Sequence, residues 1–165
     1  MSLLLRRRML LSQNQYKGYN SLISPPDFSY KYADTTVKYD YNEQVYTING
    51  TQGLSVSLCK LPEHIPIGTP YTMLAEVVND DFEVNLNSFV LGLYTNGTWA
   101  GSNLNLTKLS QDKKIFSMSS VTTKVATDVL LFNNYFSGIK VKNLKIRFLV
   151  YFGTDTVTEW EPYVE

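Results

Sequence analysis

The chain of 165 residues is long enough for one globular domain with a segment to spare, and 44% of its residues are hydrophobic, which supports a sizeable core. Its formal net charge is zero, but the first 26 residues hold four of the 15 basic residues and none of the 15 acids, which predicts a basic arm on an acidic domain. The single Cys59 excludes an intrachain disulfide, and with the single His64 it excludes a zinc site of the Cys/His type.

The chain opens with MSLLLRRRMLLSQ, in which two apolar triplets flank three arginines. A secretory signal places its positive charge first and follows it with about 7–15 apolar residues, so this order predicts a protein that is not secreted. The segment is also too short and too charged to span a bilayer. We expect it to bind a partner protein, with apolar side chains in small clefts and arginines paired with carboxylates or carbonyls. The residues assigned to this anchor are Leu3, Leu4, Leu5, Arg6, Arg7, Arg8, Met9, Leu10 and Leu11.

Residues 12–36 are polar and rich in tyrosine, and Pro25 and Pro26 within them favour an extended backbone. A disordered linker usually contains few aromatic side chains, and we therefore expect this tyrosine-rich stretch to lie ordered against a surface. The sequence therefore predicts an N-terminal anchoring arm over residues 1–36 and a folded domain over residues 37–165.

Beyond the arm, the sequence has the pattern of β-structure. Asn96-Gly97 stands between Tyr94 and Trp99 and predicts a tight β-hairpin. No helical crossover pattern appears between the apolar runs, so we expect the strands to be antiparallel. Strands are expected at residues 54–58, 71–77, 89–93, 114–119, 128–132 and 139–152.

In the run IKVKNLKIRFLVYF, the alternating apolar residues switch from odd to even positions part-way along. Ile139 and Val141 share one parity, whereas the apolar residues from Leu144 onward take the other. The slip of one residue at Lys142-Asn143 predicts a bulge or a break in this strand. Roughly eight or nine short strands at this spacing favour an antiparallel β-sandwich.

The chain ends in IKVKNLKIRFLVYFGTDTVTEWEPYVE. In residues 141–146, 153–158 and 160–163 this end resembles the closing strands of jelly-roll modules in bacteriophage and prophage tail or fibre proteins, modules that look like carbohydrate-binding modules. The opening LLLRRRMLLS resembles the starts of small structural proteins from phages of gut bacteria. Those relatives usually carry an acidic Q-L-E before the glycine, whereas RFLVYF is apolar here, which predicts that a neighbouring subunit covers this strand.

The resemblance implies an all-β fold, an antiparallel jelly-roll β-sandwich preceded by an extended N-terminal arm. It implies a virion structural protein of the fibre, tail or head-decoration type that is assembled in the host cytoplasm. Its arm would bind capsid or tail proteins, and the protein would form a homo-oligomer, with a homotrimer favoured. Within the closing motif, we expect Trp160 to seal the end of the sandwich and Pro162 to end the strand.

No catalytic constellation can be assembled from the sequence, so we predict a protein that is not an enzyme and uses no cofactor. His64 lies in the Pro-rich connection LPEHIPIGTP without a nucleophile motif nearby, and Cys59 is expected to be a small buried side chain. Glu159 and Glu161 share one strand face, which gives no opposed geometry across a sugar.

Two further ligand classes depend on charged residues. Asp80, Asp81 and Glu83 in NDDFEVN are weak candidates for calcium ligands, and a solvated turn is the favoured interpretation. Nucleic-acid binding is not expected, because the domain behind the arginines is acidic and has no basic stripe. Membrane insertion is not expected either, because so short an apolar segment anchors weakly.

Glycan binding is the activity that the sequence favours, because sugars stack on aromatic rings and form hydrogen bonds with amide side chains. Two candidate groups occur: Trp99 with Asn96 and Asn103, and Tyr135 with Asn133 and Asn134. In the alternative, both rings pack against neighbouring loops. The favoured function is therefore a virion protein whose head binds host-surface glycans. The alternatives are a free-standing carbohydrate-binding module and a decoration protein with no ligand.

Overall fold

The structure is a computed structural model that describes residues 18–20, 27–86, 88–133, 139–154 and 157–160. Within these ranges the chain is built from β-strands and turns, which confirms the predicted all-β class. No helix in the described ranges is long and apolar enough to cross a membrane. The strands are β1 (Gly18–Asn20), β2 (Ser29–Tyr32), β3 (Thr35–Asp40), β4 (Val45–Gly50), β5 (Ser55–Ile65), β6 (Pro70–Val77), β7 (Glu83–Leu86), β8 (Phe89–Thr95), β9 (Thr98–Trp99), β10 (Leu104–Asn105), β11 (Ile115–Val121), β12 (Ala126–Asn133) and β13 (Ile139–Phe152).

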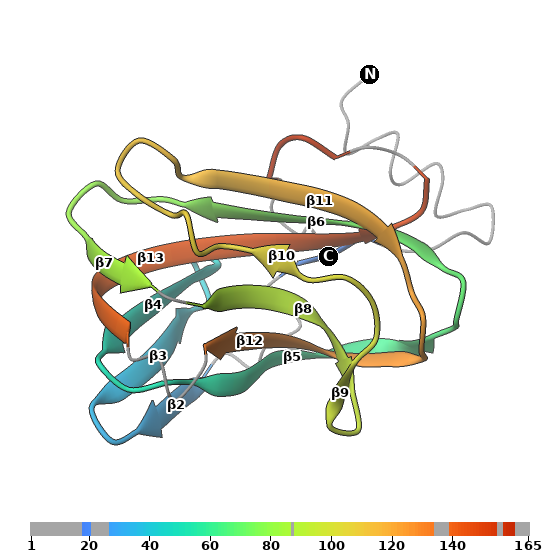
Figure 1. The fold of residues 1–165 in the computed structure, drawn as a ribbon, viewed down its shortest axis with the longest axis horizontal. Coiled ribbons are helices and arrows are strands. Elements are labelled where there is room, and N and C mark those ends of the chain that lie inside the picture. The colour runs from blue at the N-terminus through green and yellow to red at the C-terminus, as the bar shows by residue number, and fades with distance from the viewer. Residues whose placement is uncertain (1–17, 21–26, 87, 134–138, 155–156, 161–165) are drawn as a thin grey trace.

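Two antiparallel sheets pack face to face (Figure 1). The eight-stranded sheet has the order β11-β6-β13-β4-β3-β2, with β1 and β7 also paired to β13. The five-stranded sheet has the order β10-β8-β12-β5, with β9 paired to β8. The quartets β4-β13-β6-β11 and β5-β12-β8-β10 have the strand order of a jelly roll, in which the chain passes repeatedly from one sheet to the other.

The core lies between the sheets and consists of the inward side chains of alternating residues. In β8 the predicted row of Phe89, Leu91 and Leu93 is buried, and in β6 Tyr71 and Met73 are buried as well. Each such apolar side chain contributes about 1.5–3 kcal/mol when it leaves water. The facing apolar rows therefore hold the two sheets together.

The bulge predicted in the last strand is confirmed. The pairing of β13 with β4 shifts between Val141 and Leu144, and Asn143 adopts a positive φ of 52°. The backbone N–H of Asn143 donates a hydrogen bond to Asn49 Oδ1 at 2.8 Å. Because of this extra residue, Val141 and Leu144 are both buried in the core despite their opposite parity.

The hairpin predicted at Asn96-Gly97 is also confirmed. It connects β8 to β9, and φ is 40° at Asn96 and 84° at Gly97. Asparagine and glycine tolerate this left-handed conformation better than other residues, and tight hairpins need it at both positions. The turn places Trp99 directly opposite Tyr94.

The sandwich begins earlier than the predicted boundary at residue 37. β3 starts before that boundary, β2 pairs with β3, and β1 pairs with the end of β13. Phe28 packs edge-on against Tyr46, with ring centroids 5.9 Å apart, and Tyr30 also contacts the core. Tyr19, Tyr30 and Tyr32 of this stretch thus belong to strands of a sheet rather than to an arm. The anchor at residues 3–11 lies outside the described residues.

Trp160 does not seal the end of the sandwich, which corrects the prediction. It is partly buried on the outer face of the eight-stranded sheet, in a cluster separate from the main core. The other members of this cluster are Leu74, Leu149, Tyr151 and Val157. The outer apolar side of β13, for which we expected a neighbouring subunit, is therefore covered at least in part by the chain's own Val157 and Trp160.

Candidate functional site

The outer face of the five-stranded sheet carries a group of aromatic side chains. In β8 the inward row leaves Val90, Gly92 and Tyr94 facing outward, and strand pairing places residues of β9, β10 and β12 beside them. We call this surface the aromatic face. Its residues are Val90, Gly92, Tyr94, Trp99, Asn103, Asn105, Asp128, Leu130 and Phe132.

Three rings gather at the centre of the aromatic face. Trp99 meets Tyr94 edge-on with ring centroids 5.3 Å apart, and it meets Phe132 edge-on at 6.1 Å. All three side chains are partly buried, so each still exposes part of its surface. Edge-to-face contacts of this kind fix ring orientation, which prepares the surface for an apolar ligand.

Gly92 allows the rings to lie directly on the sheet. A Cβ at this position would come within 2.9 Å of the Trp99 ring and 2.2 Å of Asn103 Oδ1. Any larger residue would therefore push both side chains away from the strand. Gly92 is a requirement of close packing here and not of an unusual backbone conformation.

Asn103 supplies a polar group at the edge of these rings. Its Oδ1 atom is buried and has no hydrogen-bond partner among the described residues. A buried acceptor without a partner is costly and calls for an explanation in a native protein. Asn103 as a whole is partly exposed, so its amide would meet a ligand resting on Trp99 if the side chain turned outward.

Asp128 is the carboxylate of the aromatic face, and it is already paired. Its Oδ2 atom accepts a hydrogen bond from Ser57 Oγ at 2.7 Å and lies 3.2 Å from Lys60 Nζ. Burial has the largest single effect on the pKa of Asp128, and it raises that pKa. Hydrogen bonds from Ser57, Thr127 and Lys60, together with the charge of Lys60, outweigh burial, so the pKa of Asp128 is lowered overall. Asp128 is therefore ionised at neutral pH, and its negative charge is balanced by the positive charge of Lys60.

The structure brings together some of the residues predicted to bind glycans and separates others. Trp99 and Asn103 lie side by side as expected, and Asn96 is exposed at the tip of the hairpin. Asn133 is 0% exposed, so it cannot meet a surface ligand, and including it was wrong. The remaining two candidates, Tyr135 and Asn134, lie outside the described residues.

Tyr94 and Phe132 were missed by the sequence reasoning. Tyr94 has the opposite parity to the buried Leu93, which was a readable signal that it faces outward. Phe132 stands at the end of an apolar run, DVLLF, and only the pairing of β12 with β8 places it near Trp99. Its contribution to the site could not be read from local sequence.

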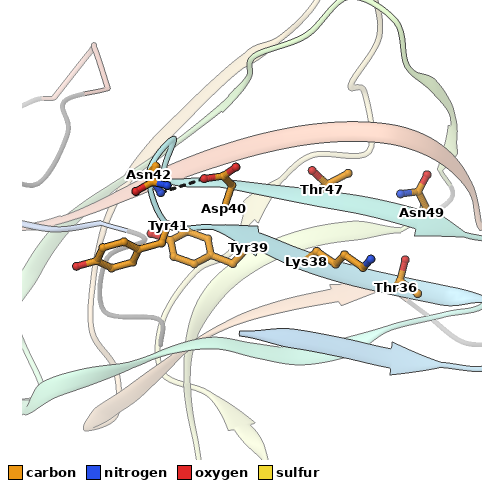
Figure 2. Close-up of a pocket in the computed structure, with 8 residues that line it drawn as sticks. All are labelled: Thr36, Lys38, Tyr39, Asp40, Tyr41, Asn42, Thr47 and Asn49. Atoms are coloured by element: carbon orange, nitrogen blue, oxygen red, sulfur yellow. Dashed lines mark hydrogen bonds between the residues drawn. The ribbon is translucent and has the colours of Figure 1, made fainter. Parts of the chain in front are cut away.

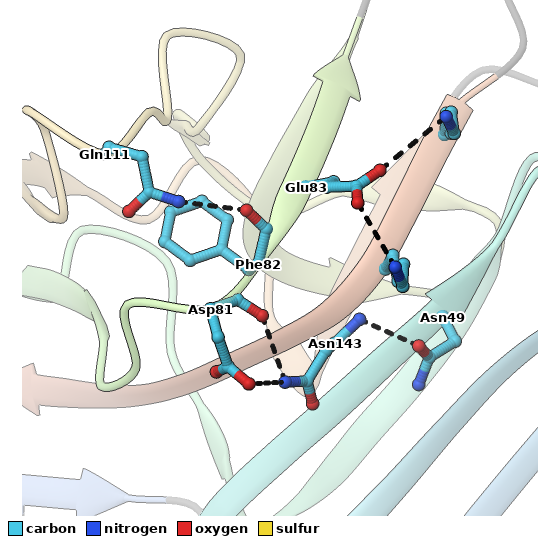
Figure 3. A network of polar contacts seen from close by, with 8 residues as sticks. Asn49, Asp81, Phe82, Glu83, Gln111 and Asn143 are labelled. Atoms are coloured by element: carbon cyan, nitrogen blue, oxygen red, sulfur yellow. Dashed lines mark hydrogen bonds and ion pairs between the residues drawn. The ribbon is translucent and has the colours of Figure 1, made fainter.

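The three carboxylates considered as calcium ligands turn to different partners, and Figure 3 shows those of Asp81 and Glu83. Asp80 pairs with Lys114, and Asp81 accepts a hydrogen bond from Asn143 Nδ2 at 2.9 Å. Glu83 pairs with two lysines of β13, whose hydrogen bonds and charges lower its pKa. In the described part of the chain, no three metal-binding side chains come together. These contacts instead tie the loop between β6 and β7 to the start of β11 and to β13, and they tie β7 to β13.

A second surface lies on the other sheet, where an open depression of about 610 Å³ covers β3 and β4 (Figure 2). It is lined by Thr36, Lys38, Tyr39, Asp40, Tyr41, Asn42, Thr47 and Asn49. The carboxylate of Asp40 accepts the backbone N–H groups of Asn42 and Glu43, so it serves its own turn. Tyr41 is 40% exposed, whereas Tyr39 is buried. The depression offers hydrogen-bonding groups with little aromatic surface.

Cys59 and His64, which were considered for catalysis, do not form a catalytic site. Cys59 is buried, and burial raises the pKa of its thiol to about 12, so it is not a thiolate at neutral pH. His64 lies exposed within β5 rather than in a connection, which corrects the prediction. The strand continues through this Pro-containing stretch because Ile65 still pairs with Ala126 of β12.

No known protein family, curated protein or solved structure matches this chain. The aromatic face and its contacts are therefore the main basis for a functional proposal.

Proposed function

We propose that the protein binds carbohydrate on the aromatic face, without catalysing a reaction, as a structural protein of a bacteriophage particle. The observation that carries the binding role is the arrangement of Trp99, Tyr94 and Phe132 around Gly92, with the unpaired Asn103 Oδ1 beside them. This arrangement combines apolar rings with an amide side chain at their edge.

Sugars are the ligands that fit such a surface best. A pyranose ring has an apolar C–H face that packs on an aromatic ring, and hydroxyls at its rim that need partners. Small-molecule sites in general combine apolar and aromatic lining with a few placed polar groups. The aromatic face is the outer surface of a sheet and not a closed pocket. It therefore fits a segment of an extended glycan chain better than a small metabolite, which needs an enclosing site.

The particle role is supported by the resemblance of both chain ends to phage structural proteins. In this proposal the basic and apolar segment at residues 3–11 binds a capsid or tail protein, and the jelly-roll domain projects outward. A single shallow site is expected to bind with a Kd in the high micromolar range, about 5–6 kcal/mol. Many copies on one particle would raise the avidity to a useful level.

A glycan array probed with the protein displayed multivalently on beads tests the binding role. Trp99→Ala should abolish binding because it removes the central ring. Asn103→Ala is a milder change and should weaken binding about 10-fold through loss of one or two hydrogen bonds. Tyr41→Ala, which removes an exposed ring on the opposite sheet, is the matched control and should bind as the unmodified protein does.

Thermal denaturation of each variant separates binding from folding. Trp99 is only partly buried, so Trp99→Ala should remain folded with a modest decrease in melting temperature. If the folded protein binds no glycan in multivalent form, the binding role is wrong and a decoration protein without a ligand describes it better. If Tyr41→Ala loses binding and Trp99→Ala does not, the ligand occupies the depression on β3 and β4.

A further inference from the structure

We propose that the glycans bound by the aromatic face are anionic, and that Lys108 and Lys113 contact their acidic groups in a pocket at the margin of this face. The inference rests on the proposed function and specifies its ligand class. The acidic group is a carboxylate, sulfate or phosphate carried by the sugar chain.

The pocket has a volume of about 450 Å³ and shares two residues, Val90 and Asn105, with the aromatic face. In the sheet, Val90 stands between Asn105 on one side and Phe132 on the other. Phe132 in turn contacts Trp99. A chain of sugars resting on the rings can therefore continue into the pocket. The lining residues are Ser88, Val90, Asn105, Thr107, Lys108, Lys113 and Phe116.

The charge of the pocket is positive. Lys108 and Lys113 are both exposed, and no carboxylate lines the pocket. Neither lysine forms an ion pair with another residue in the described part of the chain. Lys113 Nζ lies 5.0 Å from the centre of the Phe116 ring, which helps to hold it in place. Asp112 is adjacent in sequence to Lys113 but does not line the pocket.

The rest of the aromatic face does not offset this charge. Its carboxylate, Asp128, is already neutralised by Lys60. A surface with unpaired positive charge around its edge attracts and orients a negatively charged ligand.

The polar groups of the pocket add donors to this charge. Asn105 Oδ1 accepts the backbone N–H of Thr107 at 2.9 Å, which fixes the amide and leaves its Nδ2 group to donate elsewhere. Thr107 Oγ1 accepts the backbone N–H of Phe89 at 3.2 Å, so its hydroxyl hydrogen is free to donate. An acidic oxygen in the pocket would thus find amide, hydroxyl and ammonium donors together.

Isothermal titration of the full chain with matched oligosaccharides tests the inference. The probes are oligogalacturonate and its methyl ester, sulfated and unmodified dextran oligomers, and phosphorylated and unmodified mannohexaose. At least one anionic probe should bind about 10-fold more tightly than its neutral counterpart, and added salt should reduce the difference. The pair that shows the difference identifies the acidic group as carboxylate, sulfate or phosphate.

The variant Lys108→Gln/Lys113→Gln should bind the anionic probe about as weakly as its neutral counterpart, with an unchanged melting temperature. The matched control Lys31→Gln/Lys38→Gln removes two exposed lysines from the eight-stranded sheet and should leave both affinities unchanged. Equal binding of all neutral and anionic pairs, or an equal loss in the control, overturns the inference while the proposed function stands. If no probe binds and the array is also negative, the proposed function itself fails.

Discussion

Trp160 stabilises the protein from outside the main core. Its Nε1–H donates a hydrogen bond to the carbonyl of Phe148 at 3.3 Å, and the Arg147 guanidinium lies 3.9 Å from the centre of its ring. Arg147 is itself held by Glu76, with 2.8 Å between Nη2 and Oε2. These two contacts fix the ring on the outer face of the eight-stranded sheet, away from Trp99.

Trp160→Ala should destabilise the protein by about 2–3 kcal/mol, less than the roughly 3–5 kcal/mol of a fully buried tryptophan. The loss combines buried apolar area, the cation–π contact and one hydrogen bond. Urea denaturation measures the change, and glycan affinity should stay the same because the ring lies on the other sheet. An unchanged free energy of unfolding would show that this segment does not stabilise the sandwich.

The hairpin of β2 and β3 forms the edge of the eight-stranded sheet. Phe28 and Tyr30 pack against the main core from this hairpin, and the backbone N–H of Tyr39 donates to the carbonyl of Phe28 at 3.2 Å. β1 adds a short pairing to the end of β13. β1 and β2 lie entirely within residues 1–36, the stretch that we predicted to be an arm from its composition, and β3 begins there.

Deletion of residues 1–32 should therefore lower the free energy of unfolding by about 3 kcal/mol, because two partly buried aromatic side chains are lost and β3 becomes an edge strand. The melting temperature should decrease by roughly 10 °C. Deletion of residues 1–17, which removes no described strand, is the control and should have little effect. Equal melting temperatures for the two truncated proteins would mean that β1 and β2 add nothing to stability.

At the scale of the whole molecule, the two outer faces of the sandwich differ. On the eight-stranded sheet, Val157 and Trp160 cover part of the apolar outer face, and Ile115 and Val121 of β11 stay exposed as separate side chains. On the five-stranded sheet, Trp99, Tyr94 and Phe132 retain exposed surface. The aromatic face is distinct because Trp99 contacts both Tyr94 and Phe132, so that three partly exposed rings lie together rather than singly.

The proposed particle role leads to a prediction of the oligomeric state. Light scattering of the purified full chain should give three times the chain mass of 18.8 kDa. A trimer presents three aromatic faces, so its affinity for a glycan-coated surface should exceed its affinity for the free oligosaccharide by at least about 10²-fold. A monomer at every protein concentration tested would contradict the homotrimer that the resemblance implies.

The sequence by itself determined the fold class and several local features. Alternating apolar residues predicted the strands, Asn96-Gly97 predicted the hairpin, and the parity change at Asn143 predicted the bulge, because each depends on residues close together in the chain. The outward position of Trp99 beside Asn103 was likewise within reach of local patterns.

Only the tertiary structure decided which distant residues meet. Phe132 reaches Trp99 because β12 pairs with β8. Trp160 lies outside the main core because it packs with Val157 on the outer face of the eight-stranded sheet. Asn133 is buried and Asn103 Oδ1 has no partner among the described residues for the same reason. Strand pairing between distant segments sets these contacts, and local sequence does not encode the pairing partner.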